Sequence, residues 1–153
     1  MIVYRLTNGE YINDLSGTGA KLYGGRWNSP GLPALYTAGN ISLAVLEILV
    51  HIKSYRRPLD YHLITIEIPD TADPVTIDQQ KLKKSWKDDI AYGQFIGDEF
   101  LNAGQFLFLK VPSAIIDQEN NFLINPSHPD AGKIKIRSSK IFIFDKRLYL
   151  KDE

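Results

Sequence analysis

The segment GGRWNSPG, residues 24–31, places one arginine and one tryptophan among three glycines and a proline. Glycine lets the backbone approach a ligand closely and adopt positive φ. A planar guanidinium can bind a phosphate or a carboxylate through two parallel hydrogen bonds. The segment therefore predicts a bent loop on which Arg26 holds an anionic group. The same residues also fit an ordinary reverse turn, in which Trp27 is buried and Arg26 pairs with a surface carboxylate.

A single carboxylate interrupts the apolar segment ISLAVLEILVHI, residues 41–52. Helical spacing would put Glu47 and His51 one turn apart on the same face. Because an unpaired buried carboxylate is costly, Glu47 either points to solvent within a narrow polar stripe or faces a cleft. The second interpretation makes Glu47 a catalytic carboxylate on a rigid helix at the edge of a pocket.

The elements that must position these residues are those of a single α+β domain, residues 1–153, with a mixed β-sheet and a few helices. Helices are predicted over 41–55 and 88–103. Frequent glycines and prolines over 7–33 predict mostly loop. Strands are predicted over 2–6, 33–38, 61–69, 75–78, 106–112, 121–125 and 140–145.

The composition limits the classes of partner and compartment. Lys plus Arg equals Asp plus Glu, 18 each in 153 residues, so no overall field attracts nucleic acid or anionic lipid. The basic stretch KLKKSWK, residues 81–87, could bind nucleic acid with Trp86 as a stacking platform, but lysine runs are usually solvated faces or protein contacts. We expect no direct contact with nucleic acid and no membrane span. Since the amino-terminal residues lack a signal-peptide pattern, a cytoplasmic protein is expected.

The metal-ligating residue types are scarce. The chain has three histidines and no cysteine, which excludes disulfides, thiolate metal sites and a cysteine nucleophile. We therefore predict no metal site.

Five segments, in order along nearly the whole chain, together resemble the RES domain family. The family is named for an Arg, a Glu and a Ser, which fall on Arg26, Glu47 and Ser113. One departure is Gly97-Asp98-Glu99-Phe100, where the family commonly has Trp in the last position, and we expect only packing to change. The segments are GGRWNSPG (24–31), LYTA (35–38), AVLEILVH (44–51), VPSA (111–114) with NNFLINPSHPDA (120–131), and FDKRL (144–148).

The resemblance implies a function. RES domains are known as the toxins of bacterial toxin–antitoxin pairs, with an Xre-type helix-turn-helix antitoxin as partner. Their fold is similar to that of ADP-ribosyltransferases, and their reported activity is the destruction of NAD⁺, with some members modifying a protein instead. NAD⁺ would be a substrate, and no resident cofactor is implied.

The nicotinamide ring of NAD⁺ carries a positive charge. When the nicotinamide–ribose bond breaks, nicotinamide leaves as a neutral base, so no general acid is needed. The enzyme must stabilise an oxocarbenium-like sugar and hold the dinucleotide in place. Glu47 suits the first task because its carboxylate can accept a bond from a ribose hydroxyl. Arg26 suits the second because its guanidinium can bind the pyrophosphate or the ribose. Tyr36 is expected to line the nicotinamide end, by stacking or through its phenol, and is counted with Arg26 and Glu47 as catalytic.

Further residues are candidates for binding NAD⁺. Arg5 would be a second cationic arm, although an ion pair at a strand end is an equal alternative. The Ser113 hydroxyl could hold a phosphate or a ribose. Asn125 and His128, which the two prolines of NPSHP present rigidly, complete the set, although such a loop histidine is often only structural.

Three functions stay open from the sequence. The first is an NAD⁺ glycohydrolase or phosphorylase, in which water or inorganic phosphate is the acceptor. The second is a protein ADP-ribosyltransferase with the same pocket. The third is a non-catalytic nucleotide-binding or interaction module. The oligomeric state is also open, with a homo-oligomer as one form.

Overall fold

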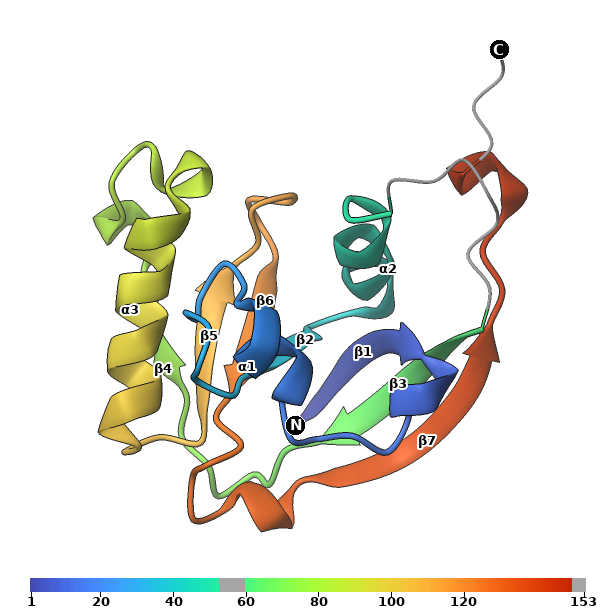
Figure 1. Cartoon of the computed structure of the whole chain (residues 1–153), viewed down its shortest axis with the longest axis horizontal. Coiled ribbons are helices and arrows are strands. Elements are labelled where there is room, and N and C mark those ends of the chain that lie inside the picture. Colours follow the sequence, from blue (N-terminus) through green and yellow to red (C-terminus); the bar gives the residue numbers. More distant parts are fainter. Residues whose placement is uncertain (53–59, 150–153) are drawn as a thin grey trace.

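One mixed β-sheet of seven strands organises the protein, in the order β4-β5-β6-β2-β1-β3-β7 (Figure 1). The computed structural model describes residues 1–52 and 60–149. Neighbouring strands are antiparallel except for the parallel pair β4 and β5. The predicted single α+β domain is confirmed. The strands are β1 (Ile2–Asn8), β2 (Leu35–Ala38), β3 (Tyr61–Glu67), β4 (Val75–Thr76), β5 (Phe108–Pro112), β6 (Asn120–Ile124) and β7 (Lys135–Phe142); the helices are α1 (Thr18–Tyr23), α2 (Ile41–Leu49) and α3 (Ile90–Ala103).

Capping residues fix where the two long helices begin and end. The Asn40 side chain accepts a hydrogen bond from the Leu43 N–H at 2.8 Å at the start of α2. Asp89 accepts one from the Tyr92 N–H at 2.9 Å at the start of α3. α3 ends at Gly104, whose φ of 61° lies in the left-handed region that favours glycine. These caps satisfy backbone groups that a helix end leaves without partners.

The core lies on both faces of the sheet, because side chains alternate along each strand. Strand residues such as Val3, Ile64 and Phe108 pack together on one face. On the other face, α3 and segment 24–31 cover β5 and β6. α2 packs on β1 and β2 of that same face, through residues such as Leu43, Ala44, Tyr4 and Ala38. The two helices therefore lie on the face of the sheet that also carries Tyr36 and Leu123.

Besides small shifts at the ends of other elements, the structure differs from the predicted elements in three places. The segment 7–33 contains the helix α1 and a short 3-10 helix over Gly9–Tyr11, which the frequent glycines concealed. The last strand begins at Lys135 instead of 140, because its mixed polar sequence at the sheet edge carries no apolar alternation. The helix predicted over 41–55 ends at Leu49, and its residues 53–55 lie outside the described part of the chain.

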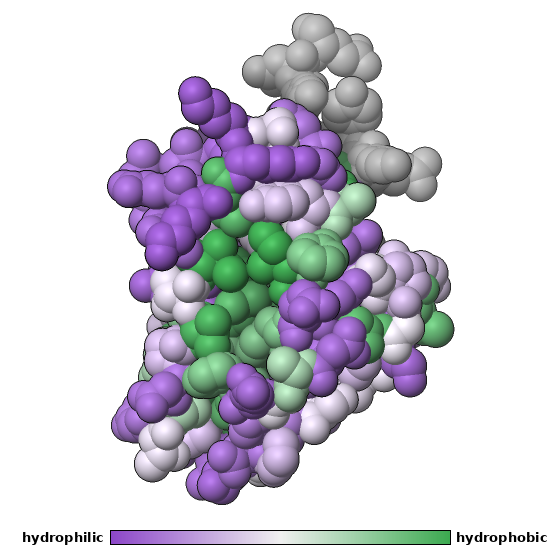
Figure 2. Space-filling model, turned by 90° about the vertical axis from the view of Figure 1, so that its left-hand side faces the viewer, coloured by the Kyte–Doolittle hydropathy of each residue, from purple (hydrophilic) through white to green (hydrophobic). Residues whose placement is uncertain are grey.

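The side of the molecule that carries α3 has a partly apolar surface. Figure 2 shows hydrophobic residues gathered near the centre of this face, with hydrophilic residues around them. α3 itself exposes Ile90 and Phe95 to solvent. Over residues 1–52 and 60–149, no helix combines the length and the apolar character that a bilayer crossing requires.

Candidate functional site

The Glu47 carboxylate is held from one side only. Its Oε1 accepts hydrogen bonds from Ser113 Oγ at 3.2 Å and from Asn121 Nδ2 at 2.5 Å. The side chain is half-buried at the middle of α2. Among the described residues, no group donates to Oε2. One oxygen is thus fixed in place, while the other is left to accept a hydrogen bond from a ligand hydroxyl.

Ser113 supports Glu47. The residue is fully buried, and its hydroxyl oxygen accepts the backbone N–H groups of Ile115 and Ile116 at 3.0 and 3.1 Å. Its single hydroxyl hydrogen goes to Glu47. A hydroxyl has one donor and two acceptor positions, so all three are occupied. The geometry therefore favours a positioning role for Ser113, and its direct contact with a phosphate or ribose stays a prediction that these contacts do not favour.

Arg26 has a guanidinium that is only partly satisfied by the protein. Its Nη1 donates to the Lys87 carbonyl at 2.7 Å, and its Cζ lies 5.8 Å from the centroid of the Trp86 ring. Within the described part of the chain, no carboxylate forms an ion pair with Arg26. Trp27 is buried. The described structure therefore lacks the alternative arrangement, in which Arg26 pairs with a surface carboxylate. The half-buried Arg26 guanidinium remains available to an anionic ligand.

Tyr36 fixes the segment that carries Arg26. Its hydroxyl accepts the Trp27 N–H at 2.9 Å and donates to Asn28 Oδ1 at 2.7 Å. Asn28 is fully buried, and its Nδ2 donates to the carbonyls of Ala20 and Leu32 at 2.8 and 3.0 Å. Burial raises the pKa of the Tyr36 phenol above its ordinary value, so the group stays neutral. Because this hydroxyl is engaged with the loop, stacking of the ring on nicotinamide stays a prediction, and the geometry does not favour a bond from the phenol.

Glu47 and Arg26 are supported at neighbouring points on one face of the sheet. In the register of β2 and β6, Tyr36 lies opposite Leu123 and Ala38 lies opposite Asn121. Asn121 therefore shares a face with Tyr36 and is its diagonal neighbour, roughly 7–8 Å away by the usual spacing of such pairs. Asn121 holds Glu47, and Tyr36 holds the segment of Arg26. That the two groups share one hollow stays a prediction, which this arrangement supports.

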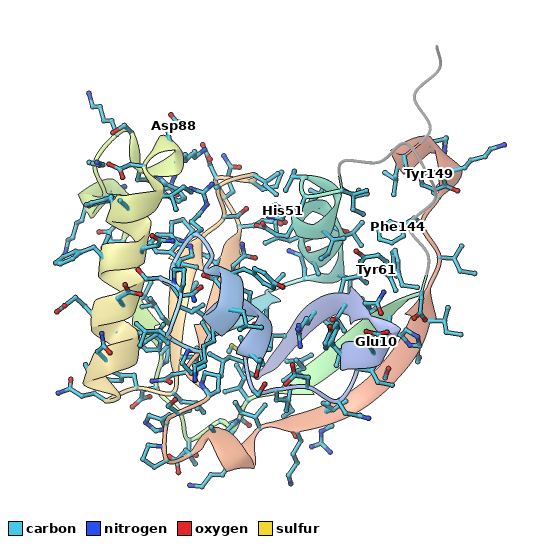
Figure 3. The ribbon with its side chains drawn as sticks, viewed as in Figure 1. Glu10, His51, Tyr61, Asp88, Phe144 and Tyr149 are labelled. Carbon is cyan, nitrogen blue, oxygen red and sulfur yellow. The ribbon has the colours of Figure 1, made fainter. Side chains whose placement is uncertain are left out.

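The turn between β5 and β6, residues 113–119, links the two groups a second time. Ser113 at its start holds Glu47, whereas Asp117 forms an ion pair with Lys87, whose carbonyl accepts from Arg26. Figure 1 shows this turn at the same end of the molecule as the end of α2 and the start of α3. In Figure 3, His51 lies just after the end of α2, and Asp88 lies just before the start of α3. The candidate site is therefore at this end of the sheet.

Arg5 is not brought to this site by any contact in the described structure. Its Nη1 donates to the Asp14 carbonyl at 2.7 Å. Burial lowers the pKa of the guanidinium from its ordinary value, and the Asp14 carboxylate opposes that shift. On β1, Arg5 shares the face of Val3, whereas Tyr4 faces α2. The geometry therefore favours a structural contact for Arg5 over the expected second cationic arm.

Asn125 and His128 lie at the far end of β6. Asn125 is buried and its Nδ2 donates to the Leu101 carbonyl at 3.2 Å, while His128 Nδ1 accepts the Asp130 N–H at 3.0 Å. Four residues of extended strand separate Asn125 from Asn121, which corresponds to about 13 Å. These two candidates stabilise a turn and are not brought into contact with Glu47. That they bind NAD⁺ stays a prediction, which this separation does not favour.

The sequence reasoning missed Asn121 as a site residue. It stands in the quoted segment NNFLINPSHPDA, and the period-2 pattern of a strand puts it on the same face as Leu123. That signal marks a polar residue on a buried face, but it does not identify Glu47 as the partner. Over the described residues, no three metal-ligating side chains are close enough to hold one ion. Metal-free chemistry stays a prediction.

Known proteins resemble this chain over most of its length. The family model of the RES domain matches residues 2–145. A protein of Photorhabdus laumondii named "Toxin Res" is 42% identical over 136 residues, which cover 87% of this chain and 86% of that protein. The "Prs ADP-ribosylating toxin" of a Sphingobium species is 39% identical over 143 residues, 91% of this chain and 89% of that protein.

A solved structure has a similar fold. The crystal structure of the M. tuberculosis MbcT–MbcA toxin–antitoxin complex contains a chain that superposes with a TM-score of 0.73. The match covers 97% of this chain and 86% of that chain, at 24% sequence identity.

Proposed function

The chain belongs to the RES domain family, and from this premise we propose that it is the toxin of a toxin–antitoxin pair that cleaves the nicotinamide–ribose bond of NAD⁺. The observation that supports the proposal most is the half-held carboxylate of Glu47. Ser113 and Asn121 fix its Oε1, and Oε2 is free to accept from a ribose hydroxyl.

To cleave this bond, the protein has mainly to stabilise the positive charge that develops on the sugar. The bond that breaks joins the ribose carbon to the pyridinium nitrogen, and its electron pair leaves with a nicotinamide that becomes neutral. The sugar gains positive charge, and the fixed carboxylate of Glu47 stabilises that charge in the transition state. Water or inorganic phosphate then forms a bond from its oxygen to the same ribose carbon, and an attacking water loses its proton to solvent. The two hydrogen bonds on Oε1 hold the carboxylate in place beforehand, so little reorganisation is needed.

Arg26 is proposed to hold the anionic part of NAD⁺. Its guanidinium has donors beyond the one that Lys87 accepts, and the described residues provide no carboxylate to neutralise it. Hydrogen bonds to charged groups contribute about 1.5–3 kcal/mol each. Arg26→Ala is therefore expected to weaken NAD⁺ binding, with a larger effect on KM than on kcat.

An assay of the purified protein tests the proposal. NAD⁺ carrying a label in its ADP-ribose part is incubated with and without inorganic phosphate, and free nicotinamide and soluble labelled products are measured. Release of nicotinamide with soluble ADP-ribose, or its phosphate, supports the proposal. NAD⁺ that binds but stays intact would instead favour the non-catalytic module.

A protein ADP-ribosyltransferase is the second candidate. One relative, 39% identical to this chain, is named for ADP-ribosylating a protein. The two activities share the bond that breaks and differ in the acceptor that attacks the sugar. Label that moves from NAD⁺ to a polypeptide, with no soluble ADP-ribose, would identify this second activity.

The proposed partner is a small Xre-type helix-turn-helix antitoxin. A solved neighbour in fold is a toxin–antitoxin complex. If the adjacent reading frame encodes such a protein, its coexpression should restore the growth of cells that produce this chain. Continued growth arrest would contradict the proposed pairing.

A further inference from the structure

Segment 24–31 lies so close to α3 that two helix positions have room for no side chain. A Cβ built on Gly93 would lie 2.5 Å from the Arg26 carbonyl oxygen. One built on Gly97 would lie 1.7 Å from the Trp27 carbonyl oxygen. Both distances are far below van der Waals contact, so the backbone of Arg26 is seated directly on the helix.

Side chains of the same helix bind the segment on both sides of Arg26. Gln94 Nε2 donates to the Gly25 carbonyl at 3.1 Å. The Asp98 carboxylate accepts two bonds from Ser29, from its N–H at 2.8 Å and from its hydroxyl at 2.6 Å. Hydrogen bonds to an ionised acceptor are about twice as strong as neutral ones. Asp98 therefore makes the strongest polar contact between α3 and the segment.

We infer that Asp98 is a positioning residue for Arg26, an inference that rests on the proposed function. The Arg26 guanidinium is held by one bond from its Nη1 to the Lys87 carbonyl. Its place therefore depends on the backbone at 26, and that backbone is fixed by the contacts of its neighbours. Two of these contacts follow Arg26 along the chain: Tyr36 accepts a hydrogen bond from the Trp27 N–H, and Asp98 accepts one from the Ser29 N–H. Without the Asp98 carboxylate, segment 24–31 would be less firmly fixed. The Arg26 guanidinium would then occupy its NAD⁺-binding position in a smaller fraction of the molecules.

The first arm of the test compares Asp98→Asn with Glu99→Gln. Glu99 is the adjacent carboxylate on α3 and is exposed, so its replacement is the matched control. In the amide, one oxygen can still accept from Ser29, but the NH2 that replaces the other oxygen can only donate, so both bonds lose their ionised acceptor. Because Arg26 is assigned to binding, the KM for NAD⁺ should rise about tenfold in Asp98→Asn with kcat changed less than about threefold. A variant that was only less folded would lower the apparent kcat and leave KM unchanged.

The second arm is a double-mutant cycle with Arg26→Ala. If Asp98 acts through Arg26, Asp98→Asn should raise KM in the parent and have little further effect in Arg26→Ala. Ser29→Ala removes only the hydroxyl donor, so it should raise KM by a smaller factor than Asp98→Asn does. It replaces Asp98→Asn in the cycle if that variant does not fold. Equal effects of Asp98→Asn in both backgrounds, or an unchanged KM in an active protein, would overturn the inference alone. A parent that leaves NAD⁺ intact would overturn the proposed function together with it.

Discussion

At the scale of single residues, the candidate site consists of Glu47 Oε2 and the Arg26 guanidinium, which the described residues leave without a donor and without a carboxylate, respectively. Of the two residues that hold Glu47, Ser113 has no further hydrogen-bonding capacity, whereas Asn121 keeps a buried Oδ1 without a partner among the described residues. Ser113 donates its only hydroxyl hydrogen to Glu47, and Tyr36 uses its hydroxyl on Trp27 and Asn28. The Ser113 and Tyr36 hydroxyl hydrogens are therefore not available to Glu47 Oε2. Sequence motifs identified both Glu47 and Ser113, but only the folded contacts show that the Ser113 hydroxyl is fully engaged with the protein and that Glu47 Oε2 is not.

The first prediction concerns Glu47→Gln. Because the amide has nearly the same shape but no negative charge, it should lower kcat about 10²–10³-fold and leave NAD⁺ affinity and thermal stability close to those of the parent. Nicotinamide release gives kcat, and calorimetric titration gives the affinity. A kcat within threefold of the parent would contradict the role of Glu47.

The second prediction concerns Ser113→Ala. It leaves the half-buried N–H groups of Ile115 and Ile116 without their acceptor. Because each lost hydrogen bond contributes about 0.5–1.5 kcal/mol, the free energy of unfolding should fall by about 1–3 kcal/mol. Turnover should fall less than in Glu47→Gln, because Asn121 still holds the carboxylate. Urea unfolding measures the first effect, and the exposed Ser139→Ala is the control. A fully inactive but equally stable variant would instead indicate direct contact with NAD⁺.

At the scale of elements, α2 and α3 lie on one face of the sheet and each brings one part of the site to it. The sequence predicted both helices and most strands, because apolar periodicity and caps are local signals. It did not predict that the backbone of segment 24–31 packs directly on α3. That role depends on Gly93 and Gly97, which from sequence alone only weaken a helix. Their close approach to a distant loop is a tertiary property.

The third prediction compares two glycines that both lie within helices. Gly93→Ala should lower the unfolding free energy and raise the KM for NAD⁺, because its Cβ would meet the Arg26 carbonyl. Gly19→Ala in α1 has no heavy atom within 4 Å of the added carbon, so it should be neutral or stabilising by up to about 1 kcal/mol. Thermal unfolding and KM are measured for both. Equal changes in thermal stability and KM in the two variants would rule out the close packing of segment 24–31 on α3.

At the scale of the whole molecule, one sheet runs through the chain and joins its early and late segments. β1 and β2 lie in the middle of the strand order, between β6 and β3. The sequence predicted the α+β class and the single domain, since composition and element order constrain both. It could not predict this order, because strand pairing is decided by long-range packing. For the same reason it did not foresee that Asn125 and His128 lie away from Glu47.

The fourth prediction follows from that topology. Because both halves of the sheet share the core residues around Val3 and Ile124, unfolding should be a single cooperative transition. Differential scanning calorimetry should give equal calorimetric and van't Hoff enthalpies. Two separate transitions would mean that the halves are independent units.

The central claim is that Glu47 and Arg26 act on the same NAD⁺ molecule. The most direct test is a crystal structure of the Glu47→Gln variant with NAD⁺, since this variant should bind without turning over. We expect one dinucleotide in hydrogen-bonding contact with the Arg26 guanidinium, with its nicotinamide-side ribose beside the side chain at position 47. NAD⁺ bound elsewhere, or in contact with only one of these two positions, would contradict the account.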